Sequence, residues 1–158
     1  MNFRPNFTFT KDEKGIPLVE KEKNFEPVEN YMARDLITFR PDTDIQVVIN
    51  TMITREISGA PVLDHNDQLV GIITEKDCLK AIINKAYHNQ PLSKSKVGDY
   101  MSKEVQTVSV DNNVVGVANA FLQTNFRRFP VVKAGKLVGQ VSRRDILKAA
   151  NMIETTTW

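Results

Sequence analysis

Apolar positions follow a helical and then an alternating spacing in each half of the chain. From Ile45 to Met52 they recur at i, i+3, i+4 and i+7, which predicts a helix with one buried face. Two apolar runs separated by a short polar turn come next, as in two paired strands, and a second amphipathic stretch follows. The predicted elements of this half are a short strand at 36–38, the helix from 45, strands at 60–63 and 69–73, and a helix from 75 to about 87.

The same order of elements returns in the second half of the chain. Val28-Glu29-Asn30-Tyr31-Met32 matches Val97-Gly98-Asp99-Tyr100-Met101, 69 positions later, and this offset continues up to the turn between the two strands. After that turn the offset is 68, and it pairs Leu69-Val70-Gly71 with Leu137-Val138-Gly139. A constant register with one gap in a turn indicates an internal duplication, of a unit too long for a solenoid repeat. The second set of elements is predicted at 105–107, from 114, at 129–132, at 137–141 and from 143 to about 153.

The duplicated order β-α-β-β-α places the chain in the α+β class. A unit of about 60 to 70 residues buries too little surface to be comfortable alone, so we expect the two repeats to pack together about a pseudo-twofold axis. A symmetric homodimer of such a pair is a natural extension. We divide the chain into an N-terminal arm or small hairpin at 1–24, a first repeat with its linker at 25–90, and a second repeat at 91–158.

Composition and charge narrow the classes of function. The 158 residues are 41% hydrophobic and 25% charged, which is ordinary for a globular protein, and a net charge of +2 does not favour nucleic-acid binding. Cys78 is the one cysteine, which is compatible with a reducing compartment, and no stretch approaches the length of a membrane span. Catalytic motifs and metal-ligand spacings are missing from the sequence. We therefore expect a cytoplasmic protein that is not an enzyme, requires no cofactor or metal, and inserts in no membrane.

A hydroxyl residue and an aspartate three residues apart follow the last strand of each copy. They are Thr74 and Asp77 in the first copy, and Ser142 and Asp145 in the second, each pair at the start of a predicted helix. Such a pair can cap the helix by satisfying its free backbone N–H groups. It can equally hold a polar ligand, because the positive end of a helix attracts phosphate and a carboxylate accepts hydrogen bonds from sugar hydroxyls. Both roles are open at this point.

The ordered set of motifs resembles a tandem pair of cystathionine-β-synthase (CBS) domains, a Bateman module. The resemblance rests on Tyr-Met-(Ala/Ser)-(Arg/Lys), the Gly-Ala-Pro-Val and Arg-Phe-Pro-Val-Val strands, Leu-Val-Gly, and (Thr/Ser)-x-x-Asp, and it covers residues 28 to about 153. It implies a stand-alone regulatory module that binds AMP, ADP, ATP or S-adenosylmethionine in two clefts between the copies. It also implies that a conformational signal passes to an effector protein. The alternative is a ligand-free structural module that dimerises or docks onto an enzyme or transporter.

The resemblance also implies which residues contact the ligand. In the family the short strand lies beside the adenine and ribose, the aspartate binds ribose hydroxyls, and the hydroxyl residue and nearby basic residues lie near phosphate. Carried over residue by residue, one cleft uses Ile37, Thr38, Ala60, Thr74 and Asp77, and the other uses Gln106, Thr107, Arg127, Arg128, Phe129, Ser142 and Asp145.

The two copies differ in charge at these positions. The second copy has Arg127-Arg128 where the first has Ser58-Gly59, and Arg143-Arg144 where the first has Glu75-Lys76. Guanidinium groups suit phosphate oxygens because their donors form a planar fork. We therefore expect the second cleft to prefer a phosphorylated ligand. The first is expected to take an uncharged nucleoside-like group, to borrow arginines across the interface, or to stay empty.

Overall fold

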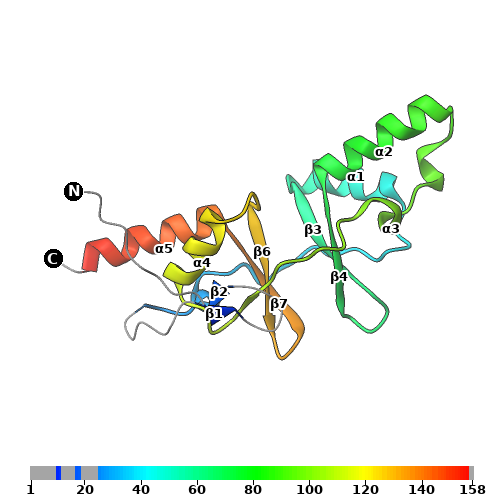
Figure 1. Cartoon of the computed structure of the whole chain (residues 1–158). Helices are drawn as coiled ribbons and strands as arrows, with labels where there is room; N and C mark the ends of the chain where they lie inside the picture. The colour runs from blue at the N-terminus through cyan, green and yellow to red at the C-terminus, as the bar shows by residue number, and fades with distance from the viewer. Residues whose placement is uncertain (1–9, 12–16, 19–24, 157–158) are drawn as a thin grey trace. The chain divides into compact units, whose positions relative to one another are not determined.

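The computed structural model describes residues 10–11, 17–18 and 25–156. The chain forms two compact units, which we call unit 1 and unit 2. Unit 1 comprises residues 1–35 together with 106–158, and unit 2 comprises residues 36–105 (Figure 1). The chain thus passes from unit 1 to unit 2 after Asp35 and returns after Val105.

Unit 2 is built on a small sheet with two helices. Its elements are α1 (Ile45–Arg55), β3 (Gly59–Leu63), β4 (Leu69–Thr74), α2 (Glu75–His88) and the short α3 (Val97–Tyr100). Strands β3 and β4 are antiparallel, and single bridges extend the sheet on both sides, from Phe39 parallel to Val62 and from Ser102 antiparallel to Ile72. The buried core of this unit is Phe39, Ile45, Val48, Met52, Ala60, Val62, Ile73, Cys78, Ala81 and Val97.

Unit 1 repeats this plan. Its elements are β5 (Val108–Ser109), α4 (Val114–Leu122), β6 (Arg128–Lys133), β7 (Lys136–Ser142) and α5 (Arg143–Thr156). The strand order is β5-β6-β7, with β5 parallel and β7 antiparallel to β6, and a bridge from Ala33 to Gln140 extends the far edge. The core gathers Val28, Met32, Val108, Val110, Val114, Val117, Ala120, Phe121, Phe129, Val131, Val141, Ile146 and Ala149.

Each unit is completed by the Tyr-Met segment of the other sequence repeat. Met32 packs over Gly139, where a Cβ would lie 2.5 Å from Met32 Sδ and 2.9 Å from Ala33 O. Met101 packs over Gly71 in the same way, where a Cβ would lie 2.6 Å from Met101 Sδ and 2.9 Å from Ser102 O. No side chain larger than hydrogen fits such an approach of two backbones. The packing unit and the sequence repeat are therefore different stretches of chain, and the boundaries set above at 24/25 and 90/91 stay a prediction.

The α+β order β-α-β-β-α is confirmed twice, with shifts at the edges. The strands placed at 36–38 and 105–107 are found one to three residues later, as the bridge at Phe39 and as β5. Val108 and Val110 supply the apolar residues that join the core there. At the N-terminus β1 (Thr10–Lys11) pairs antiparallel with β2 (Pro17–Leu18), as the suggested small hairpin requires, and the rest of the predicted arm lies outside the described residues.

Candidate functional site

Ser142 and Asp145 form a reciprocal cap at the start of α5. The backbone N–H of Ser142 donates to Asp145 Oδ2 (2.8 Å), and the Ser142 hydroxyl donates to the same oxygen (2.7 Å). In return Ser142 Oγ accepts from the backbone N–H of Asp145 (3.2 Å). This is a capping box in which aspartate takes the usual place of glutamate. The cap occupies Oδ2, and Oδ1 of the same carboxylate takes no part in it.

Thr74 and Asp77 repeat this geometry at the start of α2. Asp77 Oδ2 accepts from the Thr74 N–H (2.9 Å) and hydroxyl (2.7 Å), and Thr74 Oγ1 accepts from the Asp77 N–H (3.4 Å). Asp77 is only 8% exposed, and its Oδ1 lies 3.9 Å from Lys80 Nζ. The helix-cap role that the sequence left open is therefore observed in both copies. The ligand role of the same residues stays a prediction.

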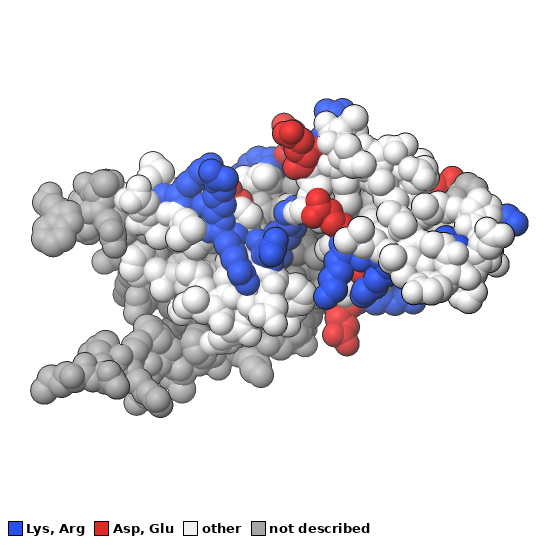
Figure 2. All heavy atoms as spheres, turned by 90° about the horizontal axis from the view of Figure 1, so that it is seen from above, with Lys and Arg blue, Asp and Glu red and all other residues white. Residues whose placement is uncertain are grey.

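The register of the strands brings the predicted residues of unit 1 to one end of its sheet. Arg128 pairs with Ser142 across β6 and β7, and the N–H of Arg143 donates to Arg127 O (3.1 Å). Thr107 directly precedes β5, which runs parallel to β6, so it reaches this same end. Both arginine pairs thus meet at the N-terminus of α5, and Arg143 Nη2 also donates to Thr124 O (3.3 Å). Figure 2 shows Lys and Arg side chains gathered in groups on the face in view.

The side chains of two predicted site residues, Phe129 and Ala60, belong to the buried cores of their units. Phe129 is buried and stacks on Phe121 with ring centroids 4.5 Å apart. Ala60, at the start of β3 in unit 2, is buried as well. Any ligand contact by these two residues therefore falls to the backbone. Gln106 is exposed and Thr107 is buried, so the second residue of this pair faces the protein.

Unit 2 has the same end of the sheet with different charges. Gly59 pairs with Thr74, and the N–H of Glu75 donates to Ser58 O (3.1 Å), which is the bond that joins Arg143 to Arg127 in unit 1. The exposed Thr38 and half-buried Ile37 precede Phe39, whose N–H donates to Pro61 O (3.1 Å). The backbone therefore sets Glu75 where unit 1 has Arg143. This end of unit 2 therefore carries a carboxylate where that of unit 1 carries guanidinium groups.

Comparison with known proteins agrees with this architecture. The family model of the CBS domain matches residues 28–84 and 97–151. The chain belongs to the CBS-domain family. Protein MJ1225 of Methanocaldococcus jannaschii is 33% identical to this CBS pair over 132 residues, 80% of this chain, and the chain spans 45% of the length of that relative.

Two solved structures of CBS proteins are similar to this CBS pair. The structure of CBSX2, a protein of Arabidopsis thaliana, in complex with AMP has a TM-score of 0.71 and 31% identity, and the match covers 81% of this chain and 98% of CBSX2. The CBS domain pair of protein MJ0100, in complex with 5-methylthioadenosine and S-adenosyl-L-methionine, has a TM-score of 0.69 and 26% identity. That match covers 82% of this chain and 98% of the MJ0100 chain.

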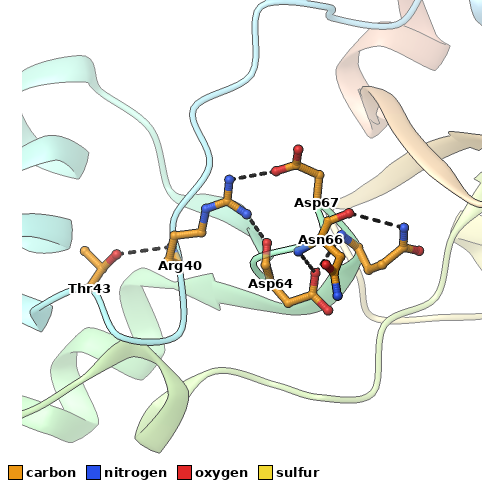
Figure 3. Close-up of polar contacts among 6 residues, drawn as sticks. Arg40, Thr43, Asp64, Asn66 and Asp67 are labelled. Atoms are coloured by element: carbon orange, nitrogen blue, oxygen red, sulfur yellow. Dashed lines mark hydrogen bonds and ion pairs between the residues drawn. The ribbon is translucent and has the colours of Figure 1, made fainter.

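Arg40 is a site-adjacent residue of the CBS pair that the sequence reasoning missed. Its guanidinium donates to the carbonyl oxygen of Asp64 and to Asp67 Oδ1 (2.7 Å), while its N–H donates to Thr43 Oγ1 (3.1 Å) (Figure 3). These bonds fasten the segment that follows Thr38 to the turn between β3 and β4. The counterpart in unit 1 is Ser109, whose N–H donates to Asn112 Oδ1 (2.8 Å). Aligning the two copies could have signalled the backbone bond, but not the contact of Arg40 with the turn.

The described part of the CBS pair was also compared with what a reactive thiol, a metal site or a membrane-spanning helix requires. Burial raises the pKa of the Cys78 thiol to about 11, and the nearby Asp77 and Glu75 carboxylates add to the effect. The thiol is therefore protonated and unreactive at neutral pH, as expected for a small buried apolar residue. Within the residues that the structure describes, no three His, Cys, Asp or Glu side chains are grouped to hold a metal ion. None of the described helices combines the length and apolarity needed to cross a membrane.

Proposed function

We propose that this CBS pair is a regulatory, non-catalytic module that binds an adenine nucleotide and passes a conformational change to a partner protein. The observation that carries the proposal is the meeting of Arg127 with Arg143 beside the Ser142–Asp145 cap. Support for the class of ligand comes from CBSX2, solved with AMP, and from the MJ0100 pair, solved with 5-methylthioadenosine and S-adenosyl-L-methionine.

The phosphate end of the ligand is assigned to unit 1. The N-terminus of α5 carries a partial positive charge, and the exposed Arg127 and Arg143 add full charges with forked donors. Asp145 keeps Oδ1 outside the cap and is assigned to the ribose hydroxyls, with Thr107 and Gln106 beside the adenine and ribose. Capping and binding are compatible here because they use different oxygens of one carboxylate.

Unit 2 is assigned a different ligand preference. Its Thr74–Asp77 cap is the same, but Glu75 and the small Ser58 replace Arg143 and Arg127. Lys76 stands in the place of Arg144 beside the opposite charge of Glu75, so a phosphate is neutralised less well here than in unit 1. An uncharged nucleoside-like group fits this end better than a nucleotide, with Ile37 and Thr38 beside it. The two sites of one chain are thus proposed to differ in the charge of the ligand they accept.

The signal follows from differential binding. A nucleotide shifts a conformational equilibrium only if it binds one state more tightly than the other. The site residues 37–38 and 106–107 directly follow the two places where the chain passes between its units, so a bound ligand acts on these connections. We propose that a homodimer of the module, in the cytoplasm, presents this change to an effector protein.

A ligand-free structural module is the second candidate. The observation that favours it is that both capping boxes are complete without any ligand, so the hydrogen bonds of Thr74, Asp77, Ser142 and Asp145 are explained by helix capping alone. Under this alternative the module serves only to dimerise or to dock onto an enzyme or transporter.

Thermal unfolding with and without AMP, ADP, ATP, S-adenosylmethionine and adenosine separates the two candidates. A ligand that binds only the native state raises the free energy of unfolding by about 2.7 kcal/mol at 100 times its dissociation constant. We expect such a rise with at least one phosphorylated adenosine ligand. No shift with any of the five compounds contradicts the sensor and favours the structural module. Mass spectrometry of small molecules released from the purified protein then names the natural ligand.

A further inference from the structure

Helix α4 of unit 1 is apolar on nearly every side. Asn119 is the one polar side chain in this helix, and none of its residues is charged. The corresponding helix of unit 2, α1, is amphipathic, with polar residues along its outer face, namely Gln46, Asn50, Thr51, Thr54 and Arg55. An amphipathic helix keeps one face in water, whereas a helix that is apolar all round is covered on all sides. The sequence of α4 therefore indicates that another segment covers its outer face.

The exposure of the two helices agrees with this difference. Val47 on the outer face of α1 is 50% exposed, whereas Gly116, its counterpart in α4, is buried. Gln46 is exposed, and its counterpart Val115 is half-buried. Strand β2 of the N-terminal hairpin lies against α4 (Figure 1). The hairpin thus covers part of the face that α1 leaves open to water.

The root of the N-terminal arm is fastened to the start of α4. The N–H of Val28 donates to Asn112 O (2.8 Å), and the N–H of Val114 donates to Glu26 O (3.2 Å). The arm therefore contacts α4 at two places, at this root and at β2.

Two apolar side chains at the other end of α4 are still open to water. Leu122, the last residue of α4, is 83% exposed, and Leu147 of α5 is 70% exposed. By the register of the duplication they correspond to Ile53 and Leu79, which line one groove between α1 and α2. Since α4 packs on α5 as α1 packs on α2, Leu122 and Leu147 lie on one face of unit 1. A contiguous apolar face of this kind marks an interaction surface.

The first nine residues, here called the N-terminal segment, have the length and the composition to cover this face. They adjoin α4, because Thr10 of β1 pairs with Leu18 of β2. Nine extended residues span about 30 Å, which is about twice the length of the nine-residue α4. The segment carries Phe3, Phe7 and Phe9, and the last two alternate with threonines as on the apolar face of a strand.

We propose that the N-terminal segment docks on the helical face of unit 1 of its own chain, with its phenylalanines over Leu122 and Leu147. A contact within one chain is favoured because a short connection gives the segment an effective concentration of about 1 mM, well above that of a separate protein at micromolar concentration. The docked segment completes the cover of α4 that β2 begins. A partner protein therefore reaches this face of unit 1 only by displacing the segment. This inference concerns the arm and the helices alone and does not depend on the nucleotide assigned above.

Thiol labelling tests the cover directly. Leu122→Cys places a thiol under the docked segment, and the natural Cys78 gives little background because it is buried and its pKa is raised to about 11. Replacing the three aromatic residues, in Phe3→Ser with Phe7→Ser and Phe9→Ser, is expected to speed the reaction of the introduced thiol with a maleimide at least about tenfold, because labelling follows the uncovered fraction. Equal rates with the wild-type and the substituted segment overturn the proposal.

Matched variants control for a general loosening of the chain. Leu79→Cys, at the counterpart of Leu147 in unit 2, is expected to react at the same rate with either segment. Asn2→Ser with Asn6→Ser and Thr8→Ser changes three polar residues of the segment and is expected to leave the labelling of Leu122→Cys slow. An acceleration at Leu79→Cys as large as that at Leu122→Cys overturns the assignment to unit 1, and circular dichroism checks that each variant folds.

The protein concentration separates cover by the chain's own segment from cover by a second copy. Protection of Leu122→Cys that stays the same from about 1 to about 100 µM protein supports docking within one chain, because such a contact does not follow mass action. Protection that grows with concentration overturns the proposal and assigns the cover to a second copy.

Discussion

The two units share one capping geometry and differ in the charges that surround it. Thr74–Asp77 and Ser142–Asp145 make the same three hydrogen bonds, and the same backbone bond ties each helix start to the residue that directly precedes β3 or β6. Around the cap, however, unit 1 places arginines where unit 2 has Ser58, Gly59 and Glu75. The common part is what the fold requires, so the difference is the part available for ligand specificity.

The largest effect is expected where the two units are alike. Gly139→Ala and Gly71→Ala each force a Cβ to within 3 Å of a methionine sulfur and a backbone oxygen of the crossing segment. Because the backbone cannot yield as a side chain does, each variant is expected to lower the free energy of unfolding by about 2 to 3 kcal/mol in urea titrations. Gly98→Ala, whose closest contact is 3.2 Å, is the milder control. If Gly139→Ala leaves the free energy of unfolding unchanged while Gly71→Ala lowers it, the packing of Met32 on Gly139 and that of Met101 on Gly71 are not equivalent.

The caps are expected to contribute equally to stability. Asp77→Ala and Asp145→Ala each remove the acceptor of two hydrogen bonds at a helix start, and each is expected to cost about 1 kcal/mol without ligand. Their effects on the AMP-induced rise in melting temperature are expected to differ. Asp145→Ala abolishes the rise, and Asp77→Ala leaves part of it. Equal loss of the AMP effect in both variants contradicts the asymmetry of the sites.

The two units also differ at Arg40 of unit 2, because unit 1 has Ser109 at the corresponding position. Arg40→Ala removes the bonds to Asp64 and Asp67, and since these groups are partly exposed, a loss of only about 0.5 to 1 kcal/mol in the free energy of unfolding is expected. Arg34→Ala is the control, because the exposed pair of Arg34 with Glu29 is looser, at 3.5 Å. An effect of Arg40→Ala no larger than that of Arg34→Ala removes the role assigned to the contact with the turn.

The smallest effect is expected at the start of the first amphipathic helix of each unit. Ser95 O and Glu26 O accept equivalent backbone bonds, from Ile45 and Val114. Among the side chains that the structure describes, Ser95 Oγ is buried without a hydrogen-bond partner, whereas Glu26 accepts from Tyr31 and Asn30. Ser95→Ala is expected to raise the free energy of unfolding by less than about 0.5 kcal/mol in urea titrations. A clear loss of stability means that a buried water serves the hydroxyl.

The sequence was sufficient for the elements and for the charge difference between the copies. The apolar spacing predicted α1, α2, α4 and α5, and the constant register predicted that the two caps are equivalent, because both signals are local. The exchange of the Tyr-Met segments was not predictable in this way. Met32 and Met101 have similar neighbours in sequence, so the local pattern does not tell which of them packs on Gly71 and which on Gly139.

At the candidate site, too, local sequence patterns predict some features and tertiary packing decides the others. The positions of Ser142, Asp145 and the arginines at one end of the sheet follow from strand register, which the duplication reveals. The burial of Phe129 does not follow, because its contact with Phe121 depends on how α4 packs on β6. The hydrogen bonds of Arg40 with the turn reach Asp64 and Asp67, which lie 24 and 27 positions further along the chain. No local sequence pattern predicts such contacts.

The affinity ratio of AMP to adenosine shows whether the arginines of unit 1 bind the phosphate of the ligand. Isothermal titration of the wild-type chain and of Arg127→Ala with Arg143→Ala measures both ligands in both proteins. Lys133→Ala with Lys136→Ala, at the other end of the β6–β7 pair, is the control for the same change of net charge. The double arginine variant is expected to bind AMP at least about tenfold more weakly, equivalent to about 1.4 kcal/mol, and to bind adenosine as the wild type does. Equal weakening of AMP and adenosine, or no weakening of either, contradicts the assignment of phosphate to the arginines of unit 1.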